Sequence, residues 1–373
     1  MNNNHLTYFK IENFKKFDSL EVTDIGQFNL IVGDNNVGKT CFLEALLFDN
    51  NNLKWISNLH QTLSIRGINF EPKHINLKDI EFPKTSYFNY IVRNINSRLV
   101  ISYKTLTETK SLAIEHKNIK DLTEKDYLKR IDAFKYENLE NWLKFFKDDV
   151  FEELQFLYQD DLDNSLDLYW PFISFNLSYS NDIEDFIRML DKKRIEEEQK
   201  LNELSFNHKQ ELIEILNKIF DFKIVDYNRK YHGDNGMLSI ATSDNPNYIP
   251  ITQFGDGFNK IFRYIVEIMF VRESEGNRLM IDEIDTGIHY SKQKDFWINI
   301  LKVCEELDVQ LFATTHSEEC TQAFVSASRF LKNTNQIRLI KLEESTNKDK
   351  VYASTFTYNQ IVAGLDSNVE LRG

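Results

Sequence analysis

One eight-residue motif constrains the fold of this chain more than any other feature. Residues 33–40 read GDNNVGKT, which fits the pattern G-x-x-x-x-G-K-[ST]. An apolar run at 28–32 precedes the motif and an amphipathic segment at 41–48 follows it. This strand–loop–helix context is the one in which the pattern forms a phosphate-binding loop. The motif therefore predicts an α/β domain that binds a nucleoside triphosphate.

The loop would bind ATP through its backbone and two side chains. Gly33 and Gly38 let the backbone curl so that its N–H groups face the phosphates, and the start of the following helix adds the positive end of its dipole. Lys39 reaches the β- and γ-phosphates, and the Thr40 hydroxyl holds Mg²⁺. The predicted nucleotide-binding residues of this loop are Gly33, Asn35, Asn36, Gly38, Lys39, Thr40 and Cys41.

An acidic pair ends a second apolar strand. Residues 279–283 read LMIDE. We expect this strand to lie beside the strand at 28–32, so that Asp282 holds Mg²⁺ directly or through water. Glu283 would orient and polarise the attacking water, which predicts a hydrolase rather than a kinase.

A histidine follows the next predicted strand. Residues 309–313 are apolar, and His316 comes three positions after them. At the carboxyl edge of that strand, an imidazole can reach the γ-phosphate, so we predict His316 as a catalytic residue. Ser317 is placed to cap the helix that follows.

A pair of glycines forms a second candidate anion site. Residues 251–263 read ITQFGDGFNKIFR, so Gly255, Asp256 and Gly257 open a predicted helix. A glycine-rich helix start binds anions, and one nucleotide does not need two such sites in one chain. We therefore predict that this loop meets the ATP of a second copy, which gives a head-to-tail dimer around two nucleotides.

Glycine also divides the chain. All twelve glycines lie within 26–67 or within 233–373. Because glycine marks tight turns and close approach to ligands, we expect a discontinuous head of residues 1–67 and 233–373, interrupted by a mostly helical insertion at 68–232.

Strand–helix alternation in the two flanks predicts a doubly wound, mostly parallel sheet with an antiparallel N-terminal β portion. The expected strands are 6–11, 20–22, 28–32, 279–281 and 309–313, with edge strands at 337–342 and 351–356; the expected helices are 40–48, 258–270, 292–307 and 318–331.

The insertion is predicted to contain one hairpin and several helices. The hairpin pairs 99–103 with 111–116, and the helices are 126–146, 151–158 and 183–220. The last helix carries two apolar stripes separated by a charged stretch at 191–200. A long solvated helix and a coiled-coil arm or dimer contact both fit this pattern.

Composition limits the location and the partners. The chain has 373 residues, is 42% hydrophobic and carries a net charge of −13. An acidic surface repels phosphates, so general binding of nucleic acid is disfavoured. Its three cysteines form no CxxC pair, and no run of about 18 apolar residues occurs. We expect a cytoplasmic protein without membrane contact.

Taken in order, these motifs resemble the ABC-type ATPases of the RecF/SMC/OLD group over roughly 4–67 and 235–373. The opening FKIENFKKF resembles the family strand that ends in N-F-[KR], which implies that Lys15 approaches the nucleotide. The run IDEIDTGIH resembles the family's Walker B and D-loop, which implies a nucleotide-site role for Asp285. ATTHS matches the motif of the switch histidine. The family's LSGGQ is absent, with Thr252 standing as a substitute serine, and Gln61 is the nearest Q-loop residue.

The resemblance also implies partners. OLD nucleases carry a Toprim domain after the histidine, whereas only 57 residues follow His316 here, so we expect a separate nuclease effector. Similar stand-alone ATPases belong to anti-phage systems such as PARIS and split OLD-like pairs, with DNA or a phage protein as the trigger. The alternative is a RecF-like repair ATPase that clamps DNA directly; a transporter ATPase fits the motifs less well.

Overall fold

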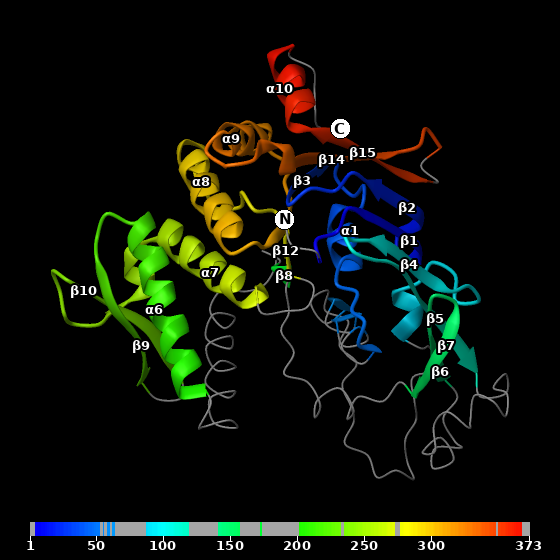
Figure 1. The fold of residues 1–373 in the computed structure, drawn as a ribbon, viewed down its shortest axis with the longest axis horizontal. Helices are drawn as coiled ribbons and strands as arrows, with labels where there is room; N and C mark the ends of the chain where they lie inside the picture. The colour runs from blue at the N-terminus through cyan, green and yellow to red at the C-terminus, as the bar shows by residue number, and fades with distance from the viewer. Residues whose placement is uncertain are drawn as a thin grey trace, which may run out of the picture.

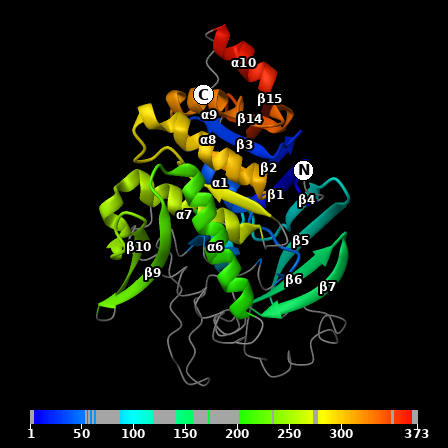
Figure 2. The ribbon, with the colours of Figure 1, turned by 60° about the vertical axis from the view of Figure 1, so that its left-hand side comes forward.

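The computed structural model describes residues 4–52, 55, 58–59, 62–63, 87–118, 141–156, 172–173, 201–232, 235–272, 277–347 and 350–367. The described residues form a central, mostly parallel sheet, an antiparallel sheet at the N-terminal side and a small three-stranded sheet (Figures 1 and 2). Helices α7, α8 and α9 lie on one side of the central sheet, and the N-terminal sheet lies on the other (Figure 1).

The central sheet has the strand order β15-β14-β3-β13-β12-β8. All neighbours in it are parallel except β15, which runs antiparallel to β14. The predicted doubly wound sheet is therefore confirmed. The predicted edge position of residues 337–342 is wrong, because β14 pairs with β3 on its other side and only β15 lies at the edge. The strands are β3 (Phe28–Gly33), β8 (Phe172–Ile173), β12 (Arg278–Ile281), β13 (Gln310–Thr314), β14 (Ile337–Glu344) and β15 (Val351–Thr357).

Two hydrophobic clusters cover the two faces of this sheet. Side chains of a strand alternate between faces, and in β3 Leu30 belongs to one cluster and Ile31 to the other. The first cluster contains side chains of α7, α8 and α9, and the second contains α1 and the N-terminal strands. Burial on both faces explains why these strands are continuous apolar runs. The helices are α1 (Lys39–Ala45), α6 (Leu201–Ile219), α7 (Asp256–Val271), α8 (Tyr290–Glu306), α9 (Glu318–Ser328) and α10 (Tyr358–Asp366).

The N-terminal sheet is antiparallel throughout, in the order β2-β1-β4-β5-β6-β7. It includes the hairpin predicted for the insertion, as β4 and β5, so the insertion extends the sheet that the N-terminus begins. The division into a head of 1–67 and 233–373 and an insertion of 68–232 stays a prediction. The strands are β1 (Tyr8–Phe14), β2 (Phe17–Thr23), β4 (Leu99–Lys104), β5 (Thr109–Asn118), β6 (Asn141–Lys147) and β7 (Val150–Phe156), and a 3-10 turn, η1 (Tyr87–Tyr90), precedes β4.

Two helices predicted in the insertion are strands in their described parts. The segments predicted to be helical from residues 126 and 151 contain β6 and β7, which pair with each other. Asp148 and Asp149 between them have φ angles of 47° and 62°. A two-residue hairpin loop needs positive φ at both positions, which Asp tolerates better than most residues. The Asp-Asp pair was therefore the sequence signal for a hairpin. The remaining parts of those predicted helices, 126–140 and 157–158, lie outside the described residues.

Helix α6 confirms the second half of the helix predicted at 183–220; residues 183–200 lie outside the described part, so the question of a coiled-coil arm stays open. It packs against α7 and against a hairpin that the sequence analysis missed. That small sheet has the order β11-β10-β9 and leads into α7 through a 3-10 turn. Its elements are β9 (Ile224–His232), β10 (Asn235–Thr242), β11 (Ile249–Pro250) and η4 (Ile251–Phe254); a further turn, η5 (Thr334–Gln336), precedes β14.

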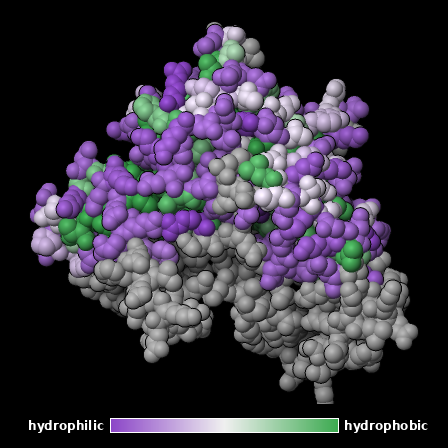
Figure 3. Space-filling view, in the orientation of Figure 1, coloured by the Kyte–Doolittle hydropathy of each residue, from purple (hydrophilic) through white to green (hydrophobic). Residues whose placement is uncertain are grey.

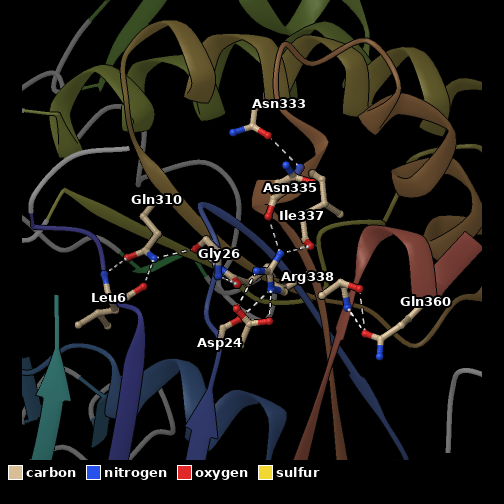
Figure 4. Close-up of polar contacts among 11 residues, drawn as sticks. Leu6, Asp24, Gly26, Gln310, Asn333, Asn335, Ile337, Arg338 and Gln360 are labelled. Carbon is tan, nitrogen blue, oxygen red and sulfur yellow. Dashed lines mark hydrogen bonds and ion pairs between the residues drawn. The ribbon is translucent and has the colours of Figure 1, made fainter. Parts of the chain in front are cut away.

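Polar side chains join the segments at the amino edge of the central sheet (Figure 4). The buried amide of Gln310 accepts a hydrogen bond from Leu6 N at 2.9 Å and donates to the carbonyls of Leu6 and Gly26, each at 2.8 Å. Arg338 of β14 donates to the Asp24 carboxylate at 2.7 Å. Gln310 therefore ties the segment before β1 and the β2–β3 connection to β13.

Replacing Gln310 by methionine is expected to lower the free energy of unfolding by about 3 kcal/mol while the side-chain volume is kept. The N–H and the carbonyl of Leu6 lose the Gln310 side chain, and the Gly26 carbonyl keeps its bond from Asn29. Equilibrium denaturation measures the change, and Gln322→Met on the exposed face of α9 is the control. A loss no larger than that of the control would refute the role given to Gln310.

The described surface in the view of Figure 3 is mostly hydrophilic, with small separate apolar patches. Single exposed apolar side chains are normal on a protein surface. Among the described residues no helix has the length and hydrophobicity that a membrane span needs. The large exposed hydrophobic residues are Tyr90, Leu106, Val150, Val225, Tyr290, Phe330 and Tyr352.

Candidate functional site

The loops that follow β3, β12 and β13 meet at the carboxyl edge of the central sheet. The register pairs Ile281 with Ala313 and Thr314 with Ile31, so the three strands end at nearly the same level. The expectation that the LMIDE strand lies beside the strand at 28–32 is wrong, because β13 lies between them. Parallel strands place all their carboxyl ends at one edge, so the predicted residues still converge.

Lys39 fills the phosphate-binding loop. Its buried amine donates to the carbonyls of Gly33 at 2.6 Å and Asp34 at 2.9 Å, and it lies 3.1 Å from Nδ1 of His316. Burial lowers the pKa of Lys39 to about 8, against the opposing effect of Asp282 and other nearby carboxylates. An incoming phosphate would replace the carbonyl partners and raise the pKa of Lys39 again.

Backbone conformation and close packing explain why residues 33 and 38 of the loop are glycines. Gly33 and Gly38 have φ angles of 145° and 114°, which side chains rarely adopt. A Cβ on Gly33 would lie 2.4 Å from the carbonyl oxygen of Leu342, and one on Gly38 would lie 2.9 Å from the ring of Phe17. The strand β14 and the start of β2 thus crowd the loop from behind. Asn35 and Asn36 are exposed at its tip, whereas Cys41 is partly buried against the second core cluster.

Thr40 and Asp282 lie in direct contact at the edge of the sheet. The Thr40 hydroxyl donates to Oδ2 of Asp282 at 2.8 Å, and the buried Thr314 hydroxyl donates to Oδ1 at 2.6 Å. Burial raises the pKa of Asp282, and the two hydroxyl groups oppose that shift. A hydroxyl beside a carboxylate suits Mg²⁺, which takes oxygen ligands and keeps several waters or phosphates. Bound there, the ion would neutralise phosphate charge.

Glu283 adopts an uncommon backbone conformation. Its φ angle is 50°, and its N–H donates to the Thr314 hydroxyl at 2.8 Å. A left-handed glutamate persists only where the surroundings enforce it, and such residues concentrate at functional sites. Its side chain is partly exposed and lies 3.4 Å from the Thr286 hydroxyl. The carboxylate is therefore accessible to water, as its predicted role needs.

His316 lies beside Lys39. Burial and the charge of Lys39 lower the pKa of His316. A neutral imidazole can accept a hydrogen bond from the Lys39 amine on Nδ1 and donate the N–H of its other nitrogen to a phosphate. Ser317 caps α9 by accepting from Cys320 N at 3.1 Å, as expected. Asp285 lies two residues after Glu283, and its carboxylate accepts a hydrogen bond from the Thr315 hydroxyl at 2.7 Å.

Lys15 lies beside α1, which follows the phosphate-binding loop. Its amine pairs with Glu44 at 2.8 Å and donates to Thr62 at 3.2 Å. The neighbouring Lys16 instead contacts the carbonyl of Asn36 in the loop and the carboxylate of Glu344. Lys15 and Lys16 are adjacent in the turn between β1 and β2, and their side chains reach different partners. The sequence shows the Lys-Lys pair but not which of the two lysines reaches the loop. A nucleotide contact of Lys15 stays a prediction.

The loop of Gly255, Asp256 and Gly257 leads into α7, and both glycines are exposed. A Cβ on Gly255 or Gly257 would meet no heavy atom within 4 Å. These glycines therefore do not serve close packing among the described residues. Gln61, the Q-loop candidate, lies outside the described residues, and Thr252 is exposed in η4.

Sequence reasoning missed three polar residues of the site. Thr314 and Thr315 hold the carboxylates of Asp282 and Asp285, and Lys16 braces the phosphate-binding loop. The sequence did contain a signal, since two threonines directly precede His316. Their partners follow only from the position of β13 between β3 and β12.

Comparisons with known proteins agree with this geometry. An ATP/GTP phosphatase of Helicobacter pylori is 22% identical over 378 residues, which cover 94% of this chain and 94% of that protein. The crystal structure of an Smc head bound to the C-winged helix domain of ScpA is 13% identical, with a TM-score of 0.52 over 95% of this chain and 98% of that chain. The SMC head domain from Thermotoga maritima is 10% identical, with a TM-score of 0.47 over 94% of this chain and 99% of that one.

The predicted ABC-type head related to the RecF and SMC ATPases is thus confirmed. The family described as "AAA domain, putative AbiEii toxin, Type IV TA system" matches residues 28–319, well over half of the sequence. The chain belongs to this family.

Proposed function

We propose that this ATP hydrolase works as a head-to-tail pair, in which each ATP is held between the phosphate-binding loop of one head and the Gly255–Gly257 loop of the other. The observation that carries the proposal is the open space at these glycines, because a glycine-rich helix start attracts phosphate and a Cβ at either glycine would meet no heavy atom of the described residues within 4 Å. Mg²⁺ would lie between Thr40, Asp282 and the phosphates.

A second observation supports the pair. Gly287 and Tyr290 follow the turn that carries Glu283 and Asp285, and the Tyr290 side chain is 69% exposed. A large aromatic residue exposed beside a catalytic turn is a typical anchor for a protein interface. The turn, the aromatic residue and the two glycines would all face the second head.

The prediction for this pair uses Gly257, where a Cβ would meet no described heavy atom within 4 Å and where φ is not positive, so a large side chain there should leave one head unstrained. Gly257→Trp should keep ATP affinity within about threefold but lower hydrolysis about 100-fold, because the neighbouring head cannot close. Sedimentation with and without ATP and phosphate release measure the two effects. Gln322→Trp on exposed α9 is the control.

Mixing variants gives the sharper result. Gly257→Trp and Lys39→Ala each remove one half of a shared site, so mixed pairs contain one intact site and should recover up to half of the activity. Two inactive variants that stay inactive when mixed, or full hydrolysis by Gly257→Trp, would refute the paired site.

We further propose that the pair regulates a separate effector, a Toprim-like nuclease, in a bacterial anti-phage system, with DNA or a phage protein as the trigger. The family description names a putative toxin, which is consistent with a role in defence. The Smc head that shares this fold is bound to a domain of a second protein, ScpA, which supports a head that passes its ATP state to a partner. Slow hydrolysis would suit such a switch.

Purification of the tagged chain from its native host, with mass spectrometry of what accompanies it, tests the regulatory role. A nuclease that co-purifies in an ATP-dependent manner is the expected result. If no second protein is found and the purified chain binds duplex DNA tightly at physiological salt, the DNA-clamping ATPase replaces the regulator.

A further inference from the structure

The turn between β12 and α8 holds the two acidic residues that follow Asp282. Its backbone folds tightly, because Thr286 N donates to the carbonyl of Glu283 at 2.9 Å and Ile288 N donates to that of Asp285 at 3.0 Å. These two hydrogen bonds hold Glu283 and Asp285 in one compact turn.

One buried hydroxyl connects this turn to the segment of His316. Thr315 is fully buried, and its Oγ1 donates to Oδ1 of Asp285 at 2.7 Å and accepts from the N–H of Ser317 at 3.0 Å. Its own N–H donates to the carbonyl of Ile31 in β3 at 3.2 Å. Both neighbours of His316 are therefore held in place. Thr315 is bonded through its N–H to β3, and Ser317 is bonded through its N–H to the Thr315 hydroxyl.

We propose that Thr315 is a positioning residue for ATP hydrolysis. Its hydroxyl holds the Asp285 turn and the His316 segment in one arrangement, so that Glu283 and His316 are aimed together at the reacting phosphate. The hydroxyl itself bonds to Asp285 and to Ser317, neither of which belongs to the phosphate-binding loop, so its loss should affect the chemical step and spare binding.

The same turn also touches α7. A Cβ on Gly287 would lie 3.3 Å from Nζ of the buried Lys260, which is one turn along α7 from Gly257. The turn therefore lies between the helix that begins at the glycine loop and the strand that ends at His316. The Thr315 hydroxyl joins this turn to the histidine segment through one side-chain atom.

The test compares three variants of similar size. Thr315→Val keeps the volume and removes the hydroxyl; it should lower kcat about 10- to 100-fold and leave the Kd for ATP within about threefold. Thr315→Ser retains the hydroxyl and should recover kcat to within about threefold. Thr321→Val removes another buried hydroxyl, which donates to the Ser317 carbonyl at 3.1 Å, and should change neither constant by more than about threefold.

A double-mutant cycle separates positioning from general packing. Asp285→Ala combined with Thr315→Val should be no slower than the more affected single variant, because both remove the same tie. Thermal unfolding of each variant identifies any that fails to fold, in which case Thr315→Ser and Asp285→Ala carry the test. Additive effects, no rescue by serine, equal losses in kcat and ATP affinity, or an equal loss in Thr321→Val would each overturn the proposal.

The inference requires ATP hydrolysis and not the paired arrangement. Single-turnover rates at saturating protein measure the chemical step directly. If Gly257→Trp hydrolyses ATP normally while Thr315→Val is slow, the paired site is refuted and the positioning role of Thr315 stands. If Gly257→Trp is slow while Thr315→Val hydrolyses ATP normally, the positioning role is refuted and the paired site stands.

Discussion

Alanine in place of Lys39 is expected to weaken ATP binding by at least about 100-fold, or ~3 kcal/mol, the typical value of a lost charge-assisted contact. The amine already lies inside the loop, on the carbonyls of Gly33 and Asp34. In the complex it would exchange these carbonyls for phosphate oxygens. Isothermal titration with ATP and Mg²⁺ measures the effect.

The control for this variant is Lys223→Ala, which removes an exposed lysine far from the loop in sequence and on the small sheet side of the molecule. It should bind ATP as the unmodified protein does. Because the Lys39 amine also lies against His316, Lys39→Ala should leave the histidine easier to protonate, since the nearby positive charge lowers its pKa. Unchanged ATP affinity in Lys39→Ala would contradict the assignment of residues 33–40 as the nucleotide site.

The fold of the two flanks could be predicted because their signals are local. A buried parallel strand is a short apolar run, and β3, β12 and β13 each appear as one in the sequence. The order of these strands could not be predicted in the same way. The position of β13 between β3 and β12 depends on which strands pair across long sequence separations, and no residue within the strands indicates that pairing.

In the insertion, even the type of secondary structure was hard to predict from the sequence. The strands β6 and β7 contain charged and aromatic residues that also suit one face of a helix, and their strand character depends on pairing with each other and on the pairing of β6 with β5. The hairpin of β9 and β10 is similar, since it packs against α6, which precedes it in the chain, and single-strand patterns do not show that packing. The spacing of apolar residues alone cannot distinguish a helix from a strand in segments of seven to nine residues.

At the site, residue types were predictable and contacts were not. Gly33, Lys39, Thr40, Asp282 and Glu283 follow from motifs whose chemistry depends on a few neighbouring residues. Roles that depend on which strand is adjacent stayed hidden until the fold was known.

Glutamine in place of Glu283 is expected to reduce ATP hydrolysis by about 100- to 1,000-fold while ATP affinity stays within about threefold. The change removes the base that polarises water and keeps the volume. It leaves the Thr40–Asp282 pair and Lys39 untouched, so the magnesium and phosphate contacts survive. The left-handed backbone, with a φ of 50°, is as accessible to glutamine as to glutamate. Slow hydrolysis with intact binding should trap the ATP-bound pair of heads.

Phosphate release under single-turnover conditions, together with sedimentation in the presence of ATP, measures both consequences, and Glu152→Gln on the exposed surface of β7 is the control. The result divides the two roles that an acidic residue at this position can have. If Glu283 only helped to hold Mg²⁺, its loss would weaken ATP binding and the requirement for the ion would change. If it activates water, the rate falls and the affinity does not. Hydrolysis at the normal rate by Glu283→Gln would exclude both roles and would move the search for the base to Asp285, the other carboxylate of the same turn.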